Sequence, residues 1–290
     1  MSLHEQTTTT SGVEILGIVK LPEEKVVEIV GEVHGADNKF CEQLIAKDLL
    51  GPYEVFCEHA TSLCRLNPEE HDLFKSVTGS EYIFYNLMKE GKKTPVCFDN
   101  RIDSNLPSMI EESAMIRFFE TETFEKDLFS TLRVIVVRLN EIIQRLGEMQ
   151  PMFKAFYKDQ FQDFMQCISI QFSILIKSMS RGEKFMKGKS FFLPEIPNYT
   201  IICRVSCALC MNIRKLCSAY VDINLFVLMS KSKAKKIVVF TGASHAHRLL
   251  TIVLKKKAEI VVPLKPELEE AVSFVPEGSL ERELQFLQLF

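Results

Sequence analysis

Short hydrophobic runs alternate with amphipathic stretches over the first hundred residues of the chain. Residues 26–30 (VVEIV), 53–60 (YEVFCEHA) and 95–101 (PVCFDNR) are apolar over nearly their whole length, which is typical of strands buried on both faces of a parallel sheet. Between them, residues 37–51 and 80–93 carry apolar residues at helical spacing. This alternation predicts a parallel sheet covered by helices.

The same pattern returns near the C-terminus after a long helical middle. Residues 108–230 contain few turn signals and have apolar positions at helical spacing, whereas strands are predicted at 236–241 and 258–264 with a helix at 245–257 between them. We therefore predict an α/β fold with a mainly parallel central sheet, helices on both faces and a large helical insertion or cap in the middle. The segments on either side of the insertion should share one sheet.

These patterns divide the chain into four parts. Residues 1–22 open with the polar stretch MSLHEQTTTTSG and are expected to be a disordered tail. Residues 23–107 form the first α/β half, residues 108–230 the helical insertion, and residues 231–290 the second α/β half. The chain ends in SLERELQFLQLF (279–290), an amphipathic helix that we expect to dock on the core, on a protein partner or on a second copy.

Composition narrows the function classes. A net charge of −3 gives no electrostatic reason to expect binding to nucleic acid or to an anionic membrane. No uncharged apolar run reaches transmembrane length, so no integral membrane segment is expected. The chain has nine cysteines and no recognisable secretory signal. We therefore expect free thiols throughout and an intracellular, cytoplasmic location.

Two predicted strands end in the same short motif. Residues 31–34 read Gly-Glu-Val-His and residues 242–245 read Gly-Ala-Ser-His, each after an apolar run and before a helix. In an open parallel sheet, ligand sites form just beyond the carboxyl ends of the strands. Because both motifs are expected in one sheet, we predict that His34 and His245 meet at its edge.

Charged residues end the other predicted strands too. Glu58 ends the second strand, Asp99 and Arg101 end the third, and Glu32 lies in the first Gly-x-x-His turn. Charges that directly end buried strands are costly unless they are paired or used. An ion pair between Glu58 and Arg101 is the structural alternative to a reactive role.

With these motifs, the chain resembles the TIKI/TraB/erythromycin esterase/ChaN-like superfamily over residues 26–101 and 236–262. TIKI-like members are metal-dependent peptidases, the erythromycin esterases use a histidine base without metal, and ChaN-like members bind haem. The resemblance implies an active site with His34 and His245 as paired histidines, Glu58 as the strand-end carboxylate, and Asp99 or Arg101 as the supporting polar residue.

We therefore predict a hydrolase that cleaves an amide or ester bond in a peptide or small molecule. In one version His34, His245 and Glu58 bind Zn²⁺, Mn²⁺ or Fe²⁺, which activates water. In the other, His34 is a general base without metal, oriented by Glu32 or Glu58. Arg248 lies three residues after His245, on the same helix face, and suits an anionic substrate group or an oxyanion.

The alternative is an inactive binding or scaffold protein that keeps the fold, with haem or metal binding as a variant of it. Internal hydrogen bonds that saturate Glu58 or His34 would favour the scaffold. A metal or a pocket that contacts both histidines would favour the enzyme. The candidate residues are, for catalysis, His34, Glu58, His245, Glu32 and Arg101, and, for substrate binding, Arg248 and Asp99.

Overall fold

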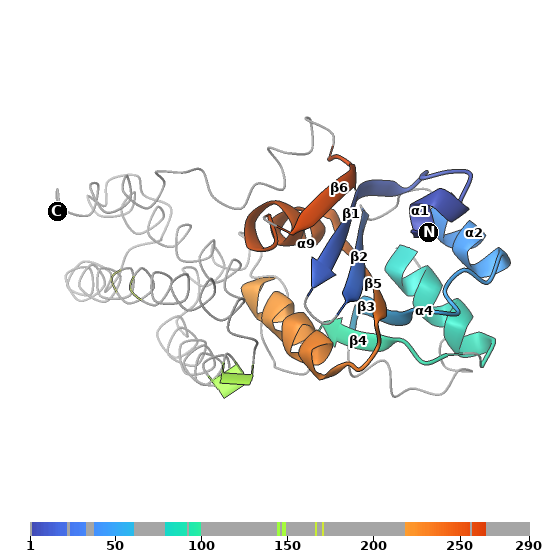
Figure 1. Cartoon of the computed structure of the whole chain (residues 1–290). Helices are drawn as coiled ribbons and strands as arrows, with labels where there is room; N and C mark the ends of the chain where they lie inside the picture. The colour runs from blue at the N-terminus through green and yellow to red at the C-terminus, as the bar shows by residue number, and fades with distance from the viewer. Residues whose placement is uncertain are drawn as a thin grey trace, which may run out of the picture. The chain divides into compact units, whose positions relative to one another are not determined.

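The computed structural model separates the chain into two compact units. One comprises Met1–Asp99 and Ser232–Phe290, the other Asn100–Lys231. The structure describes residues 2–21, 24–32, 38–60, 79–91, 93–99, 218–255 and 257–264, together with residues 144, 145, 147, 148, 166 and 170. Among these residues, every strand belongs to the first unit (Figure 1).

The first unit is built on one six-stranded mixed sheet. In chain order its strands are β1 (Val13–Leu21), β2 (Lys25–Glu32), β3 (Glu54–Ala60), β4 (Val96–Asp99), β5 (Lys236–Gly242) and β6 (Ala258–Val262). The spatial order is β4-β3-β5-β2-β1-β6, with parallel pairing from β4 to β2 and antiparallel pairing on both sides of β1. The predicted α/β class and mainly parallel sheet are confirmed, and the strands before and after the insertion do share one sheet.

The N-terminal segment corrects the sequence-based prediction. Residues 1–22 were expected to be a disordered tail, yet they contain the short helix α1 (Leu3–Gln6) and the strand β1. β1 pairs with β2 on one side and with β6 on the other, and its side chains Leu16 and Val19 are fully buried. The prediction was wrong because the polar run ends at Gly12 and the apolar run after it is long enough for a strand.

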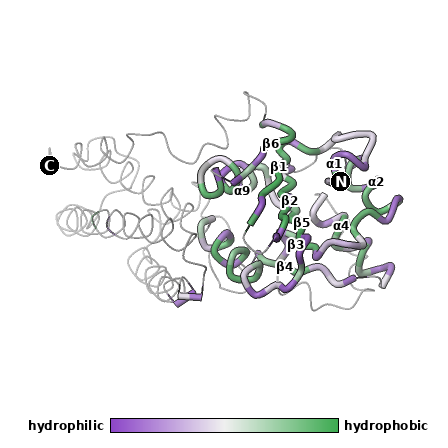
Figure 2. The backbone as a smooth tube through the Cα atoms, viewed as in Figure 1, coloured by the Kyte–Doolittle hydropathy of each residue, from purple (hydrophilic) through white to green (hydrophobic). Residues whose placement is uncertain are grey.

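Helices pack against both faces of the sheet (Figure 1). On one face, α2 (Lys39–Ala46) and α4 (Gly79–Lys89) pack together with the side chains of alternate strand residues such as Val30 and Cys57. On the other face, α9 (Ala243–Arg248) packs against β2 and β1 and continues directly into the π-helix η2 (Leu249–Val253). Because both faces of the sheet are covered, the middle parts of the central strands are mainly hydrophobic (Figure 2).

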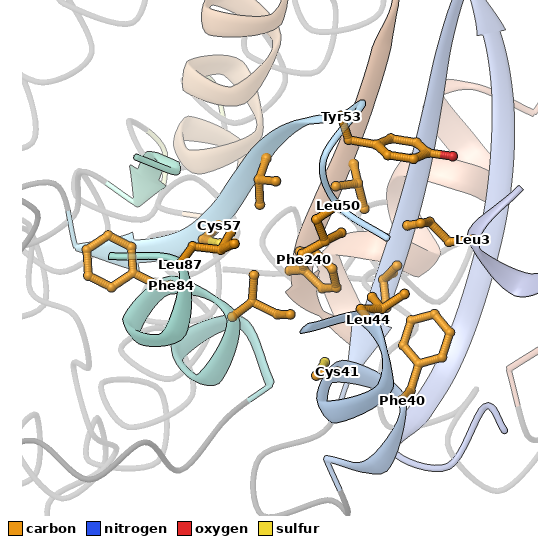
Figure 3. Packing of buried hydrophobic residues seen from close by; sticks show 14 of the residues in the cluster. Leu3, Phe40, Cys41, Leu44, Leu50, Tyr53, Cys57, Phe84, Leu87 and Phe240 are labelled. Carbon is orange, nitrogen blue, oxygen red and sulfur yellow. The ribbon is translucent and has the colours of Figure 1, made fainter. Parts of the chain in front are cut away.

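The main hydrophobic core lies between the sheet and the helices α2 and α4. Figure 3 shows Phe40 and Leu44 of α2, Phe84 of α4 and Phe240 of β5 in one cluster, and all four are buried. Leu3 of α1 is part of the same cluster, so the N-terminal segment contributes to the core as well as to the sheet.

Three predicted helices have other bounds in the structure, and the one predicted at 80–93 spans Gly79–Lys89. The helix predicted at 37–51 spans Lys39–Ala46, because Asp48 takes a left-handed conformation with φ of 52° that a right-handed helix cannot continue through. The helix predicted at 245–257 begins two residues earlier, at Ala243, and changes to π-helical hydrogen bonding at Leu249. All three predicted helices exist, but local spacing did not define where they begin and end.

Gly31 provides a test of how closely α9 packs on the sheet. A Cβ at this position would lie 2.5 Å from Ala246 Cβ and 2.6 Å from Ile15 Cγ2. We expect Gly31→Ala to lower the free energy of unfolding by about 1–3 kcal/mol through overpacking. Gly51→Ala is the matched control, because its nearest new contact would be at 3.6 Å. Equal stability of the two variants in urea titrations would contradict the close packing.

The second unit is described over a helical segment and a few other residues. Residues 218–231 are helical. Arg145 donates a hydrogen bond to Asn224 Oδ1 and lies 5.8 Å from the ring centroid of Tyr220, and Lys231 Nζ lies 2.6 Å from Glu148 Oε2. The rest of the predicted insertion 108–230 and the predicted C-terminal helix 279–290 lie outside the described residues. None of the helices in the described part of the chain combines the length and the apolar character of a membrane span.

The cysteines correct a further prediction. Cys41 and Cys57 are free and buried, as expected for cysteines within apolar runs. Cys97 of β4 is disulfide-bonded, so the expectation of free thiols throughout is wrong. The prediction of a reducing compartment loses the support that it drew from that expectation.

Candidate functional site

The two Gly-x-x-His segments begin at the same edge of the sheet. β2 and β5 are neighbouring parallel strands, and Glu32 of the first motif is in register with Gly242 of the second. His245 lies in the first turn of α9. His34 follows Glu32 by two positions and lies outside the described residues. The neighbouring strands that a meeting of His34 and His245 requires are therefore present, and the meeting itself stays a prediction.

A chain of three side chains occupies this edge on the α9 face of the sheet. Glu58, near the end of β3, has its Oε1 atom 3.5 Å from His245 Nε2. The other ring nitrogen of His245, Nδ1, lies 3.1 Å from a guanidinium nitrogen of Arg248. The side chains of Glu58 and His245 are 14% and 8% exposed, and Arg248 is buried. The structure thus brings together three of the residues predicted for the site.

Glu58 is held by two further hydrogen bonds that the sequence did not suggest. Its Oε2 atom accepts a hydrogen bond from Thr241 Oγ1 at 2.5 Å and another from the backbone N–H of Gly242 at 2.8 Å. These bonds fix one carboxylate oxygen and leave the other directed at His245. The alternation of side chains along β5 could have indicated this contact. Thr241 is in register with Gly31, and α9 covers the face of the sheet at Gly31.

Glu32 lies on the opposite face of the sheet from Glu58. Its Oε1 atom accepts the backbone N–H of Ser80 at 2.7 Å, and the backbone N–H of Gly79 also donates to this carboxylate. Glu32 therefore binds the N-terminus of α4, where the helix dipole favours a negative charge. Alternation along β2 and β3 directs the candidates Glu32 and Glu58 to different faces, so the structure does not bring these two carboxylates to one site.

Burial makes Glu32 an unusual carboxylate. Its residue is 8% exposed, and this loss of solvent raises the pKa of Glu32 from 4.5 to about 7. The hydrogen bonds from Ser80 and Gly79 act in the opposite direction, whereas the negative charges of Glu58 and Glu81 raise the pKa further. Near neutral pH, Glu32 is thus present in both protonated and ionised forms.

Asp99 and Arg101 are the candidates predicted at the end of the third strand. Asp99 ends β4 at the edge of the sheet and is in register with Ala60, two residues after Glu58. Arg101 lies outside the described residues, so its predicted ion pair with Glu58 is untested. His59 points to the α4 face, where its ring centroid lies 4.6 Å from that of Phe84, and is buried there.

A second buried carboxylate was missed by the sequence reasoning. Glu28 of β2 accepts hydrogen bonds from the backbone N–H of Leu3 at 2.9 Å and from Tyr53 Oη at 2.6 Å. Burial raises the pKa of Glu28. These bonds tie α1 to the sheet. The sequence could have indicated this contact, because Glu28 is a single carboxylate inside the apolar run VVEIV. A charge in a buried strand needs hydrogen-bond or ionic partners.

The donors in the described residues do not match a metal site. Structural and catalytic zinc sites use three or four protein ligands, and the described part of the chain contains no group of three His, Cys, Asp or Glu side chains that could hold a metal ion. A ligating histidine usually donates its second ring N–H to a carboxylate, a carbonyl or water. The second nitrogen of His245 faces Arg248, which can only donate. His245 in this arrangement therefore does not fit as a ligand to a metal or to haem iron.

Comparison with known proteins adds no relative. No family model matches the chain, and neither a curated protein nor a solved structure is similar to it. The resemblance to the TIKI/TraB/erythromycin esterase/ChaN-like superfamily accordingly rests on the sequence motifs and stays a prediction.

Proposed function

We propose that the chain is a hydrolase that cleaves an amide or ester bond by a mechanism based on carboxylate and histidine side chains. The observation that carries this proposal is the chain of contacts from Glu58 through His245 to Arg248 at the carboxyl ends of β3 and β5. Sites in open parallel sheets form at such strand ends. In acyl transfer to water, a carboxylate can act as a general base, and an imidazole or a guanidinium can stabilise the negative charge that develops on the substrate.

Each of these groups has a chemical role in the proposed reaction. One oxygen of Glu58 is held by Thr241 and Gly242, so the other oxygen, Oε1, can accept a proton from an attacking water. His34 is the second candidate for this base, by its place in the first motif. Arg248, as a buried cation against His245, keeps the imidazole in a fixed orientation.

Hydrolysis assays on the full chain test the proposal. A panel of p-nitrophenyl esters and fluorogenic peptide amides would be assayed with wild type, Glu58→Gln and Glu54→Gln. We expect Glu58→Gln to lower kcat/KM about 100-fold, because a positioned general base contributes about 10²–10⁴-fold. Glu54→Gln is the matched control, since it makes the same change on the same strand, and should stay close to wild type. Absence of hydrolysis across the panel, or equal rates for both variants, would refute the proposal.

The metal-dependent version of the hydrolase stays a separate prediction. It needs His34, His245 and Glu58 to act together as ligands, and it requires the contact between Arg248 and His245 to open. Full activity after exhaustive treatment with a chelator supports the metal-free proposal. Loss of activity that returns with Zn²⁺, Mn²⁺ or Fe²⁺ would replace it by the metal-dependent version, and His34→Ala would then also lower the bound metal content.

A binding or scaffold protein is the second candidate function. This function is favoured because the carboxylates already have hydrogen-bond donors within the chain. Glu58 accepts two hydrogen bonds at Oε2, and Glu32 accepts hydrogen bonds from two backbone N–H groups of α4. In that case the panel shows no hydrolysis, and Glu58→Gln lowers the stability of the fold.

A further inference from the structure

The position of Arg248 has a consequence for the protonation of His245. A guanidinium group has five N–H donors and no acceptor, and it stays charged in proteins. Because an Arg248 nitrogen lies 3.1 Å from His245 Nδ1, this ring nitrogen must present its lone pair. In the neutral imidazole, the single ring proton then resides on Nε2, the nitrogen that faces Glu58.

We propose that Arg248 is a positioning residue that fixes neutral His245 as its Nε2–H tautomer, so that His245 acts in the site as a hydrogen-bond donor. In this state neither ring nitrogen is open to take a proton from water or to bind a metal ion. The inference rests on the proposed function in one respect, since it assigns the role of His245 within that site. The tautomer itself is a property of the chain without substrate.

The contact between His245 Nε2 and Glu58 Oε1 is long for a hydrogen bond. The distance of 3.5 Å from Nε2 to Glu58 Oε1 is longer than the about 2.7–3.2 Å of an ordinary N–H···O hydrogen bond. An oxygen that develops negative charge beside Nε2 would form a shorter and stronger bond, as donors that are already oriented do in acyl-transfer sites.

This assignment orders the proposed reaction. The water oxygen bonds to the carbonyl carbon while its proton passes to Glu58 Oε1 or to His34, and the electron pair of the C=O bond moves to the carbonyl oxygen, which accepts the hydrogen bond from His245. When that pair re-forms the C=O bond, the bond to the leaving oxygen or nitrogen breaks. The leaving atom keeps the bonding electrons and takes the proton held by the base.

Nitrogen NMR on the full-length chain tests the tautomer directly. Long-range ¹H–¹⁵N correlation spectra of protein labelled with ¹⁵N-histidine distinguish protonated from unprotonated ring nitrogens, and His245→Gln assigns the signals. We expect His245 of the wild type at pH 8 to have a protonated Nε2 and an unprotonated Nδ1. A protonated Nδ1 would overturn the proposal.

Three variants separate the effect of Arg248 from that of Glu58. In Glu58→Gln, the donors Thr241 and Gly242 retain the amide oxygen, so the NH₂ group faces Nε2 and opposes the Nε2–H tautomer. We expect this variant to keep Nε2–H, because Arg248 still occupies Nδ1. In the double variant with Arg248→Met, Nδ1–H should become the major form, whereas Arg248→Lys should retain Nε2–H. A tautomer change in Glu58→Gln alone would assign the control to Glu58 and refute the role of Arg248.

A zinc titration keeps the inference testable if the double variant does not fold. Addition of Zn²⁺ to the wild type should leave the His245 signals unchanged, and loss of the Nε2 proton on zinc binding would overturn the proposal. These measurements need no substrate. A chain that hydrolyses nothing but shows the expected tautomer loses the proposed function and retains this inference, whereas an active chain with a protonated Nδ1 does the reverse.

Discussion

Replacement of Phe240 by alanine should lower the free energy of unfolding by about 3–5 kcal/mol, the range measured for truncation of buried aromatic residues. Phe240 is 1% exposed and lies on β5, between β2 and β3 in the middle of the sheet. Its ring packs in the cluster formed with α2 and α4 (Figure 3). Alanine would leave a cavity there, because strands on both sides prevent β5 from moving to fill it.

The matched control is Ile260→Ala on the edge strand β6. Ile260 is 43% exposed, so its truncation removes much less buried apolar surface and should cost less than about 1 kcal/mol. Urea unfolding monitored by circular dichroism would measure both variants. Equal destabilisation by the two substitutions would contradict the assignment of Phe240 to the core.

The second large effect is a dependence of stability on pH that originates at Glu32. Burial raises the pKa of Glu32 to about 7 in the folded chain, compared with 4.5 for an ordinary glutamate. Between these pH values the folded state holds a proton that the unfolded state has released. The contribution of Glu32 to the free energy of unfolding is thus largest below about pH 4.5. It decreases as the pH rises to about 7 and then stays constant. The difference corresponds to about 3 kcal/mol.

Glu32→Gln should remove this slope, because glutamine does not titrate. The measured quantity is the difference in unfolding free energy between the variant and the wild type from pH 4.5 to 8, which isolates Glu32 from other groups such as Glu28. We expect the difference to change by about 3 kcal/mol in favour of the variant as the pH rises. Glu24→Gln, at a carboxylate whose side chain is 87% exposed, should show a flat difference. A flat difference for Glu32→Gln as well would contradict the effect of burial.

Much of the fold could be predicted because strands and helices leave a local pattern in the sequence. The apolar runs at 26–30, 53–60 and 236–241 each correspond to a strand, since a strand covered on both faces must be apolar along its length. β1 was missed because it follows a polar run and has no helix beside it to complete the alternating pattern. Helix ends were less accurate, because a single left-handed residue at Asp48 ends α2 without a glycine or proline signal.

The candidate site was predictable to the extent that it depends on spacing. A helix places residues three apart on one face, which brought Arg248 to His245 as expected. The strand-end position of Glu58 suggested that it would lie at the same edge. The division of Glu32 and Glu58 between two faces could not be predicted from residue types, because it depends on which side chains of each strand point towards α4 and which towards α9.

The sequence by itself determined the α/β class, most of the strands, and the presence of charged residues at their carboxyl ends. Only the tertiary structure decided that β5 lies between β2 and β3, and hence that Thr241 and Gly242 donate to a carboxylate more than 180 positions earlier in the chain. Strand order is set by the packing of the whole sheet and leaves no local pattern. The hydrogen bonds of Glu58 and its contact with His245 Nε2 follow from that order, since they join residues that are distant in sequence.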